Sequence, residues 1–185
     1  MRQLPSIRIH LAAVFLLFFA LVAVLGMFNL LRLRNFNLLS AEVAEIWLPT
    51  MRAVGDLNNY TSDFRAIEGG NLLASDAAGV AASEKNMAGL DRSIAGSERA
   101  FEAISHDVAV ANLYRDFVAR WAAYRVIVNQ MLELSRSGQK SAALAIYNGS
   151  SRTAYDAASD TLGQLTDHAV ADAKVASDRL RAAYR

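Results

Sequence analysis

The chain has 185 residues, no cysteine and only two prolines, Pro5 and Pro49. Without cysteine, disulfides, thiolate metal ligands, covalently attached haem and thiol nucleophiles are all excluded. Beyond residue 34 the sequence also lacks the alternation of apolar and polar residues that is typical of strands, and it has no Gly-x-Gly phosphate loop. A helical protein without cofactor chemistry is the class that these absences favour.

Charge is missing from one long stretch. Residues 9–31, IHLAAVFLLFFALVAVLGMFNLL, contain no Asp, Glu, Lys or Arg. A helix of roughly 20 apolar residues crosses a bilayer, and its backbone amides are satisfied within the segment. The main alternative is a cleavable signal peptide, which has an apolar run of about 7–15 residues and a small-x-small cleavage site. Since Met27–Leu31 offers no such site, we expect an uncleaved membrane span.

The orientation of the span is weakly encoded, because two arginines flank each end and the Lys/Arg balance barely decides it. A short amino-terminal flank commonly stays in the cytoplasm, and Glu42 and Glu45 soon follow the second basic pair. We therefore expect residues 1–8 in the cytoplasm, residues 9–31 in the membrane and residues 32–185 outside the cytoplasm.

The composition beyond residue 34 excludes further classes. It holds 15 Lys and Arg against 18 Asp and Glu, a formal charge of −3, whereas nucleic-acid binding needs a concentrated basic surface. The three histidines lie far apart in sequence, and there is no Glu-x-x-His pair of the di-iron type. No Ser/His/Asp pattern is evident. We predict a single domain that is not an enzyme, holds no metal or cofactor and binds no nucleic acid.

Periodicity is the strongest signal after the span. Four stretches repeat inward-facing residues at spacings of three and four, which is the period of one face of a helix. These stripes run over Val43–Glu68, Val80–Ile104, Val110–Met131 and Leu144–Ala176. The third carries most of the aromatic side chains. We predict that the core includes Leu90, Ile94, Phe117, Trp121, Val128 and Leu162.

Breaks between the stripes fall at Gly69–Ala78, at Ser105–Asp107 and around Ser137–Gly138. Ser105 precedes a polar turn suited to capping, and Gly138 follows the last periodic residue of the third stripe. Short connections make neighbouring helices antiparallel, so the pattern predicts an all-α, up-down-up-down four-helix bundle that continues from the membrane helix. Pro49 should kink the first helix or begin a new one, because proline cannot donate a backbone hydrogen bond.

The order of these features resembles the sensor module of bacterial methyl-accepting chemotaxis receptors of the four-helix-bundle class. After the basic amino terminus and the span, IWLPTMRAVGDLNNYTSDFRAIEGGNLLAS (Ile46–Ser75) is similar to the family's Trp-Leu-Pro start and later Arg-x-x-Glu. SGQKSAALAIYNGSSRTAYDAASDTLGQL (Ser137–Leu165) is similar to its Gly-x-x-x-Ala opening and small polar middle.

The resemblance implies a receptor in the inner membrane, whose periplasmic domain binds a small molecule and which forms a homodimer. Receptors of this family continue into a second span, a HAMP linker and a cytoplasmic coiled coil, so we interpret the chain as an amino-terminal fragment. The same module also resembles the input domains of histidine kinases and diguanylate cyclases. A membrane-anchored helical interaction protein that binds no ligand is a further alternative.

A ligand site needs polar groups of adjacent helices at one height. Arg65 lies 33 residues beyond Arg32, and Arg152 lies 33 residues before Arg185, which places both about 50 Å above the membrane. In the family, an arginine of the first helix and small polar residues of the fourth helix bind the ligand at the subunit interface. The resemblance therefore assigns ligand binding to Arg65, Ser151, Arg152 and Thr153.

The guanidinium fork of an arginine suits a carboxylate, so we predict a small organic acid or amino acid as the ligand. Two alternatives stay open. Arg65 can instead pair with Glu68, three residues along its own helix. Three arginines on the third helix, Arg115, Arg120 and Arg125, form another candidate anion site.

Overall fold

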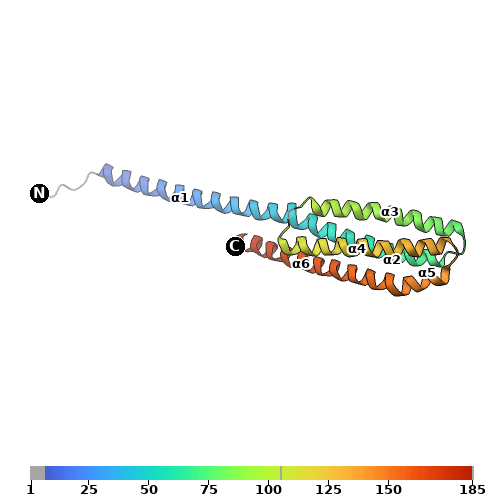
Figure 1. Cartoon of the computed structure of the whole chain (residues 1–185). Coiled ribbons are helices and arrows are strands. Elements are labelled where there is room, and N and C mark those ends of the chain that lie inside the picture. Colours follow the sequence, from blue (N-terminus) through green and yellow to red (C-terminus); the bar gives the residue numbers. More distant parts are fainter. Residues whose placement is uncertain (1–6, 105, 185) are drawn as a thin grey trace.

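The structure is a computed structural model that describes residues 7–104 and 106–184; the predicted capping residue Ser105 lies outside this range. Every element in the described part of the chain is helical. The first three are α1 (Ile7–Glu42), a π-helical turn η1 (Val43–Trp47) and α2 (Leu48–Leu73), which follow one another without a break. They form the long helix at the blue and cyan end of Figure 1.

The remaining elements complete an antiparallel bundle, as predicted. They are α3 (Ala77–Glu102), α4 (Val108–Arg136), α5 (Lys140–Ile146), a second π-helical turn η2 (Tyr147–Ser151) and α6 (Arg152–Tyr184). The segments α5, η2 and α6 are consecutive and form the fourth long helix of the bundle. Helix α2 packs along α3 and α6, α4 packs along α6, and the end of α6 returns beside α1 (Figure 1).

The membrane-spanning candidate projects from the bundle. The helix from Leu11 to Leu73 is long and apolar enough to cross a membrane, and none of its most apolar window is buried. Large apolar side chains from Leu11 to Leu33 are exposed all around it. A surface of this kind is unfavourable in water and suits lipid.

Pro49 lies at the junction between η1 and α2, within a helical run that continues from Leu11 to Leu73. It lies in the first turn of α2, immediately after η1. Because proline lacks a backbone N–H, the α-helical hydrogen-bond ladder is interrupted, and the chain accommodates this as a π-helical turn.

The glycine pair Gly69–Gly70 does not break the helix either, and α2 continues to Leu73. A Cβ atom added to Gly69 would lie 2.8 Å from the hydroxyl oxygen of Tyr147. Gly69 therefore allows Tyr147 to approach the backbone of α2, and the true break is the shorter segment Ala74–Asp76.

The other helix ends follow ordinary capping chemistry. Asp76 accepts a hydrogen bond from the Gly79 amide at 2.8 Å, and Asp107 accepts one from Val110 at 2.9 Å, so both act as N-caps. Gly138, with φ of 78°, ends α4, and the amide of Gln139 reaches the carbonyl of Leu134 at 2.9 Å.

The core matches the predicted one with two differences. Five of the six predicted residues are buried, and Leu90 is half-buried against them. The fourth stripe is displaced by one residue at its start: Leu144 is 49% exposed, whereas Ala143 is fully buried. The reason is η2, because a π-helical turn holds one more residue than an α-helical turn and shifts the face that precedes it.

Candidate functional site

A buried polar network joins α2, α4 and η2 in the distal half of the bundle. Arg65 donates from Nη1 to Glu68 Oε2 at 2.7 Å and to Ser151 Oγ at 2.8 Å. The Ser151 hydroxyl donates to Glu68 Oε1 at 2.6 Å, and the Tyr124 hydroxyl donates to Glu68 Oε2. Glu68 is fully buried, so its carboxylate depends on these three partners.

The second nitrogen of the Arg65 guanidinium holds the backbone of η2. Its Nη2 donates to the carbonyl oxygen of Tyr147 at 2.9 Å. The guanidinium carbon also lies 3.8 Å from the centre of the Tyr147 ring and 5.6 Å from that of Tyr155. This cation–π contact and the hydrogen bonds fix the side chain of Arg65, of which only 14% is exposed.

The electrostatics of the network favour one charge state. Burial works against the charge of Arg65, but the hydrogen bond and the negative charge of Glu68 outweigh it and raise the pKa of Arg65. Burial and the Glu68 carboxylate together raise the pKa of Tyr124, so its hydroxyl stays a donor. The network therefore contains one cation and one anion, both held by neutral hydroxyls.

The four predicted ligand residues separate into two pairs. Arg65 and Ser151 are in hydrogen-bond contact, and Arg65 also makes the alternative pairing with Glu68. Arg152 is 72% exposed, and its Nε lies 3.8 Å from Asp156 Oδ2 on the same helix. Thr153 is exposed and bonds the carbonyl of Gly149 at 3.3 Å.

Sequence reasoning missed Tyr124 and the Tyr147 carbonyl as members of this network. One signal was available, because Glu68 occupies an inward position at the end of the first stripe. A charged residue at such a position requires buried partners.

The third-helix arginines do not form a shared site. Arg115 bonds the side chain of Asn112, and Arg120 pairs with Asp116 at 2.8 Å. Arg125 pairs with Asp91 of α3 at 2.7 Å, and its guanidinium carbon lies 4.0 Å from the centre of the Phe64 ring. Each of these arginines thus has a separate local partner.

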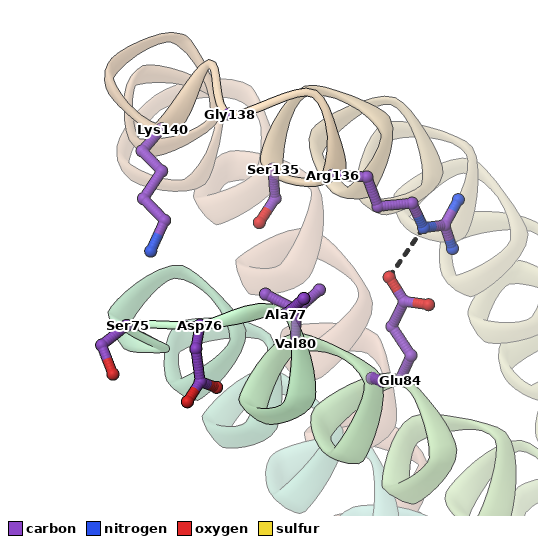
Figure 2. Close-up of a pocket in the computed structure, with 10 residues that line it drawn as sticks. Ser75, Asp76, Ala77, Val80, Glu84, Ser135, Arg136, Gly138 and Lys140 are labelled. Atoms are coloured by element: carbon purple, nitrogen blue, oxygen red, sulfur yellow. Dashed lines mark hydrogen bonds and ion pairs between the residues drawn. The ribbon is translucent and has the colours of Figure 1, made fainter.

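A cavity of about 410 Å³ opens at the distal end of the bundle, between the α2–α3 and α4–α5 turns (Figure 2). Lys140 donates to the carbonyl of Ala74 across it, and Arg136 Nε pairs with Glu84 Oε1 at 2.7 Å. Ser135 lines the cavity and donates to the buried Asn71 Oδ1 at 2.8 Å. The volume is in the range of small-molecule sites.

At the opposite, membrane-proximal end, the aromatic side chains pack without such a network. The ring of Phe101 stacks on His106 at 4.0 Å and on Tyr114 at 4.4 Å between ring centres. One nitrogen of His106, Nε2, lies 2.9 Å from the carbonyl oxygen of Phe101. His106 therefore has a packing role in the described structure.

Comparison with known proteins identifies the family of this chain. A family model described as a four-helix-bundle sensory module for signal transduction matches residues 4–184. No curated protein matches the chain. The match covers the membrane-spanning candidate, the whole bundle and the Arg65 network. The chain therefore belongs to the four-helix-bundle sensory modules of methyl-accepting chemotaxis proteins.

Proposed function

We propose that this chain is the periplasmic sensory region of a chemotaxis receptor in the inner membrane, and that it detects a small carboxylate. Residues 1–8 lie in the cytoplasm, residues 9–31 span the membrane and residues 32–185 form the sensor. The observation that carries the proposal is the uninterrupted helix from Leu11 to Leu73, which joins the span to the bundle and contains Arg65.

The geometry supports transmission of a conformational signal from the bundle to the membrane. Helix α6 packs on α2 beside the Arg65 network and on α1 near the membrane (Figure 1). A ligand that changes the contact between α2 and α6 therefore changes the position of two helices at the membrane side. This requires only that the ligand binds the two arrangements of α2 and α6 with different affinity.

A carboxylate is the ligand chemistry that fits Arg65. Its Nη1 already holds the Glu68 carboxylate, whereas its Nη2 holds only the neutral carbonyl of Tyr147. A ligand carboxylate can replace that carbonyl, because a charge-assisted hydrogen bond is roughly twice as strong as a neutral one. The exposed Arg152 and Thr153, which follow Ser151 directly, complete the outer side of the site.

The proposed receptor is a homodimer that uses the outer faces of α2 and α6. Thr50, Thr61, Ser151 and Ala158 are among the small or polar residues of the first and fourth stripes, and small or polar residues often form interfaces between helices. All four are buried inside a single subunit. These four residues therefore do not form the proposed interface, which would consist of exposed residues of α2 and α6.

Ligand binding to the full chain tests the proposal. Small organic acids and amino acids are screened by thermal shift in detergent, and affinities are then measured by calorimetry. Arg152→Ala removes a charge-assisted hydrogen bond, which is worth about 1.5–3 kcal/mol, so affinity should fall at least about tenfold. Arg120→Ala is the matched control, because Arg120 is also exposed and pairs with an acid four residues away.

A third variant distinguishes the two candidate positions of the bound carboxylate, the Arg65 site and the distal cavity. Lys140→Ala changes the distal cavity and leaves Arg65 and Arg152 in place. If Lys140→Ala weakens binding and Arg152→Ala does not, the carboxylate lies in the distal cavity and the Arg65 proposal is wrong. If no small carboxylate binds at all, the ligand class is wrong.

A further inference from the structure

We propose that η2 is a switch between two registers of α5, one with Ala143 in the core and one with Leu144, and that Arg65 holds the first. The switch adds regulation to the sensory function proposed above and rests on it. It concerns the part of the fourth long helix between the distal cavity and the Arg65 network.

Two registers are available because η2 contains one residue more than an α-helical turn. If η2 relaxes into an α-helix, the segment before it turns by about 100°, the rotation of one residue. Leu144 would then take the inward position that Ala143 holds now. The sequence supports this second register, because Leu144, Tyr147, Ser151 and Tyr155 follow the spacing of a regular helix.

The observed register is held by contacts from α2 to both ends of η2. At its start, the Tyr147 carbonyl accepts from Arg65 Nη2 at 2.9 Å, and the Tyr147 ring lies under the guanidinium. At its end, Ser151 accepts from Arg65 Nη1 at 2.8 Å and donates to Glu68 at 2.6 Å. Gly69 leaves the space that Tyr147 occupies. One guanidinium therefore binds both ends of the π-helical turn.

The switch connects two sites. A ligand carboxylate that takes Nη2 from the Tyr147 carbonyl removes the contact at the start of η2. Rotation of α5 then moves Lys140, which lines the distal cavity (Figure 2), away from the carbonyl of Ala74 that it bonds across the cavity. Occupation of the Arg65 site would change the shape of that cavity in the same step.

Cysteine labelling of the full chain tests the register, since the protein has no cysteine of its own. Ala143→Cys and Leu144→Cys are made separately, and their rates of reaction with a maleimide are measured without ligand. Leu144→Cys should react at least about tenfold faster, because a buried thiol reacts only after local opening. Arg65→Lys keeps a charge for Glu68 but has one nitrogen, which cannot bind both ends of η2. In this background the ratio of the two rates should fall at least about tenfold.

A deletion of Gly149, the exposed middle residue of η2, provides the second arm. It removes the extra residue and leaves Ala143 inward in a regular helix, so the labelling ratio should stay high even with Arg65→Lys. Deletion of Gly163, an exposed glycine in the regular part of α6, is the matched control and should lower the midpoint of thermal unfolding much more.

Three results would overturn the switch. The first is an unchanged labelling ratio in Arg65→Lys when circular dichroism reports a folded helical protein. The second is the same fall in ratio with and without the Gly149 deletion. The third is equal damage from the two deletions. All three are measured without ligand, so the switch can fail while carboxylate binding stands, and binding can fail while the switch stands.

Discussion

The two halves of the bundle satisfy their buried polar groups in different ways. Near the membrane and at mid-height, the buried hydroxyls of Thr50, Thr61 and Thr161 bond carbonyl groups four residues back in their own helices. In the distal half, Glu68 and Asn71 of α2 bond partners on α4, and Glu68 also bonds Ser151 of η2. The proximal half also has single bonds between helices, from Tyr114 to Glu102 at 2.8 Å and from Thr161 to Asp116 at 3.4 Å. Among the described residues, the distal half differs because one fully buried carboxylate, that of Glu68, joins three elements.

This difference determines whether each half of the bundle contributes mainly stability or a fixed register between its helices. Apolar side chains tolerate small shifts between helices, because dispersion and burial are not directional. A buried carboxylate with three partners tolerates little, because a shift leaves a polar group unpaired in a medium of low dielectric constant. The proximal half therefore supplies stability, and the distal half determines the register of α2 against η2.

The largest expected effect is in the proximal core. Phe117 is fully buried and stacks with Trp121 at 6.4 Å between ring centres. Phe117→Ala should lower the free energy of unfolding by about 3–5 kcal/mol, as measured by urea denaturation. Val126→Ala on the same helix is the control, because Val126 is 58% exposed and its truncation should cost under about 0.5 kcal/mol. A loss of under about 1 kcal/mol for Phe117→Ala would mean that this side chain does not hold the core.

The next effect is in the distal network. Arg65→Ala leaves the buried carboxylate of Glu68 without its cation, so unfolding should become easier by about 2–3 kcal/mol. Arg152→Ala, in an exposed pair of similar helix spacing, should change stability by under about 0.5 kcal/mol.

A double variant shows whether the loss comes from the stranded charge. Replacing both partners, Arg65→Met with Glu68→Leu, should recover part of the stability, because a buried ion pair is often no better than apolar packing. The recovery stays incomplete, because the buried hydroxyls of Tyr124 and Ser151 lose Glu68 as their acceptor. Equal losses in Arg65→Ala and Arg152→Ala would mean that the buried distal network contributes no more to stability than an exposed ion pair.

The sequence predicted the bundle well because burial imposes a regular period on every helix. Phe117, Trp121 and Val128 could be assigned to the core from spacing alone. Counting residues from the membrane placed Arg65 and Arg152 at the same height, since the rise per residue of a helix is nearly constant. Ser151, the neighbour of Arg152, does contact Arg65.

Two of the errors, at Leu144 and at Gly69, involve the π-helical turn η2. A periodic pattern does not reveal where one extra residue is inserted, so Leu144 was assigned to the face that Ala143 occupies. Gly69 was interpreted as a helix break because its neighbour Tyr147 comes from a distant part of the chain. Of the partners of Glu68, Arg65 was predicted as an alternative pairing, and Tyr124 comes from α4. Only the bond from Ser151 depends on which residues η2 turns inward.

The smallest expected effect separates the two glycines of this pair. Gly69 and Gly70 both lie inside α2, where glycine is less favourable than alanine by roughly 0.5–1 kcal/mol. A Cβ atom on Gly70 meets no described atom within 4 Å, so Gly70→Ala should stabilise the protein by about that amount. A Cβ atom on Gly69 would lie 2.8 Å from the Tyr147 hydroxyl and 3.3 Å from its ring, so Gly69→Ala should give no such gain. Thermal unfolding of the two variants measures the difference directly. If Gly69→Ala is as stable as Gly70→Ala, Tyr147 is free to move away from α2, and the close contact between η2 and α2 does not constrain the register of η2.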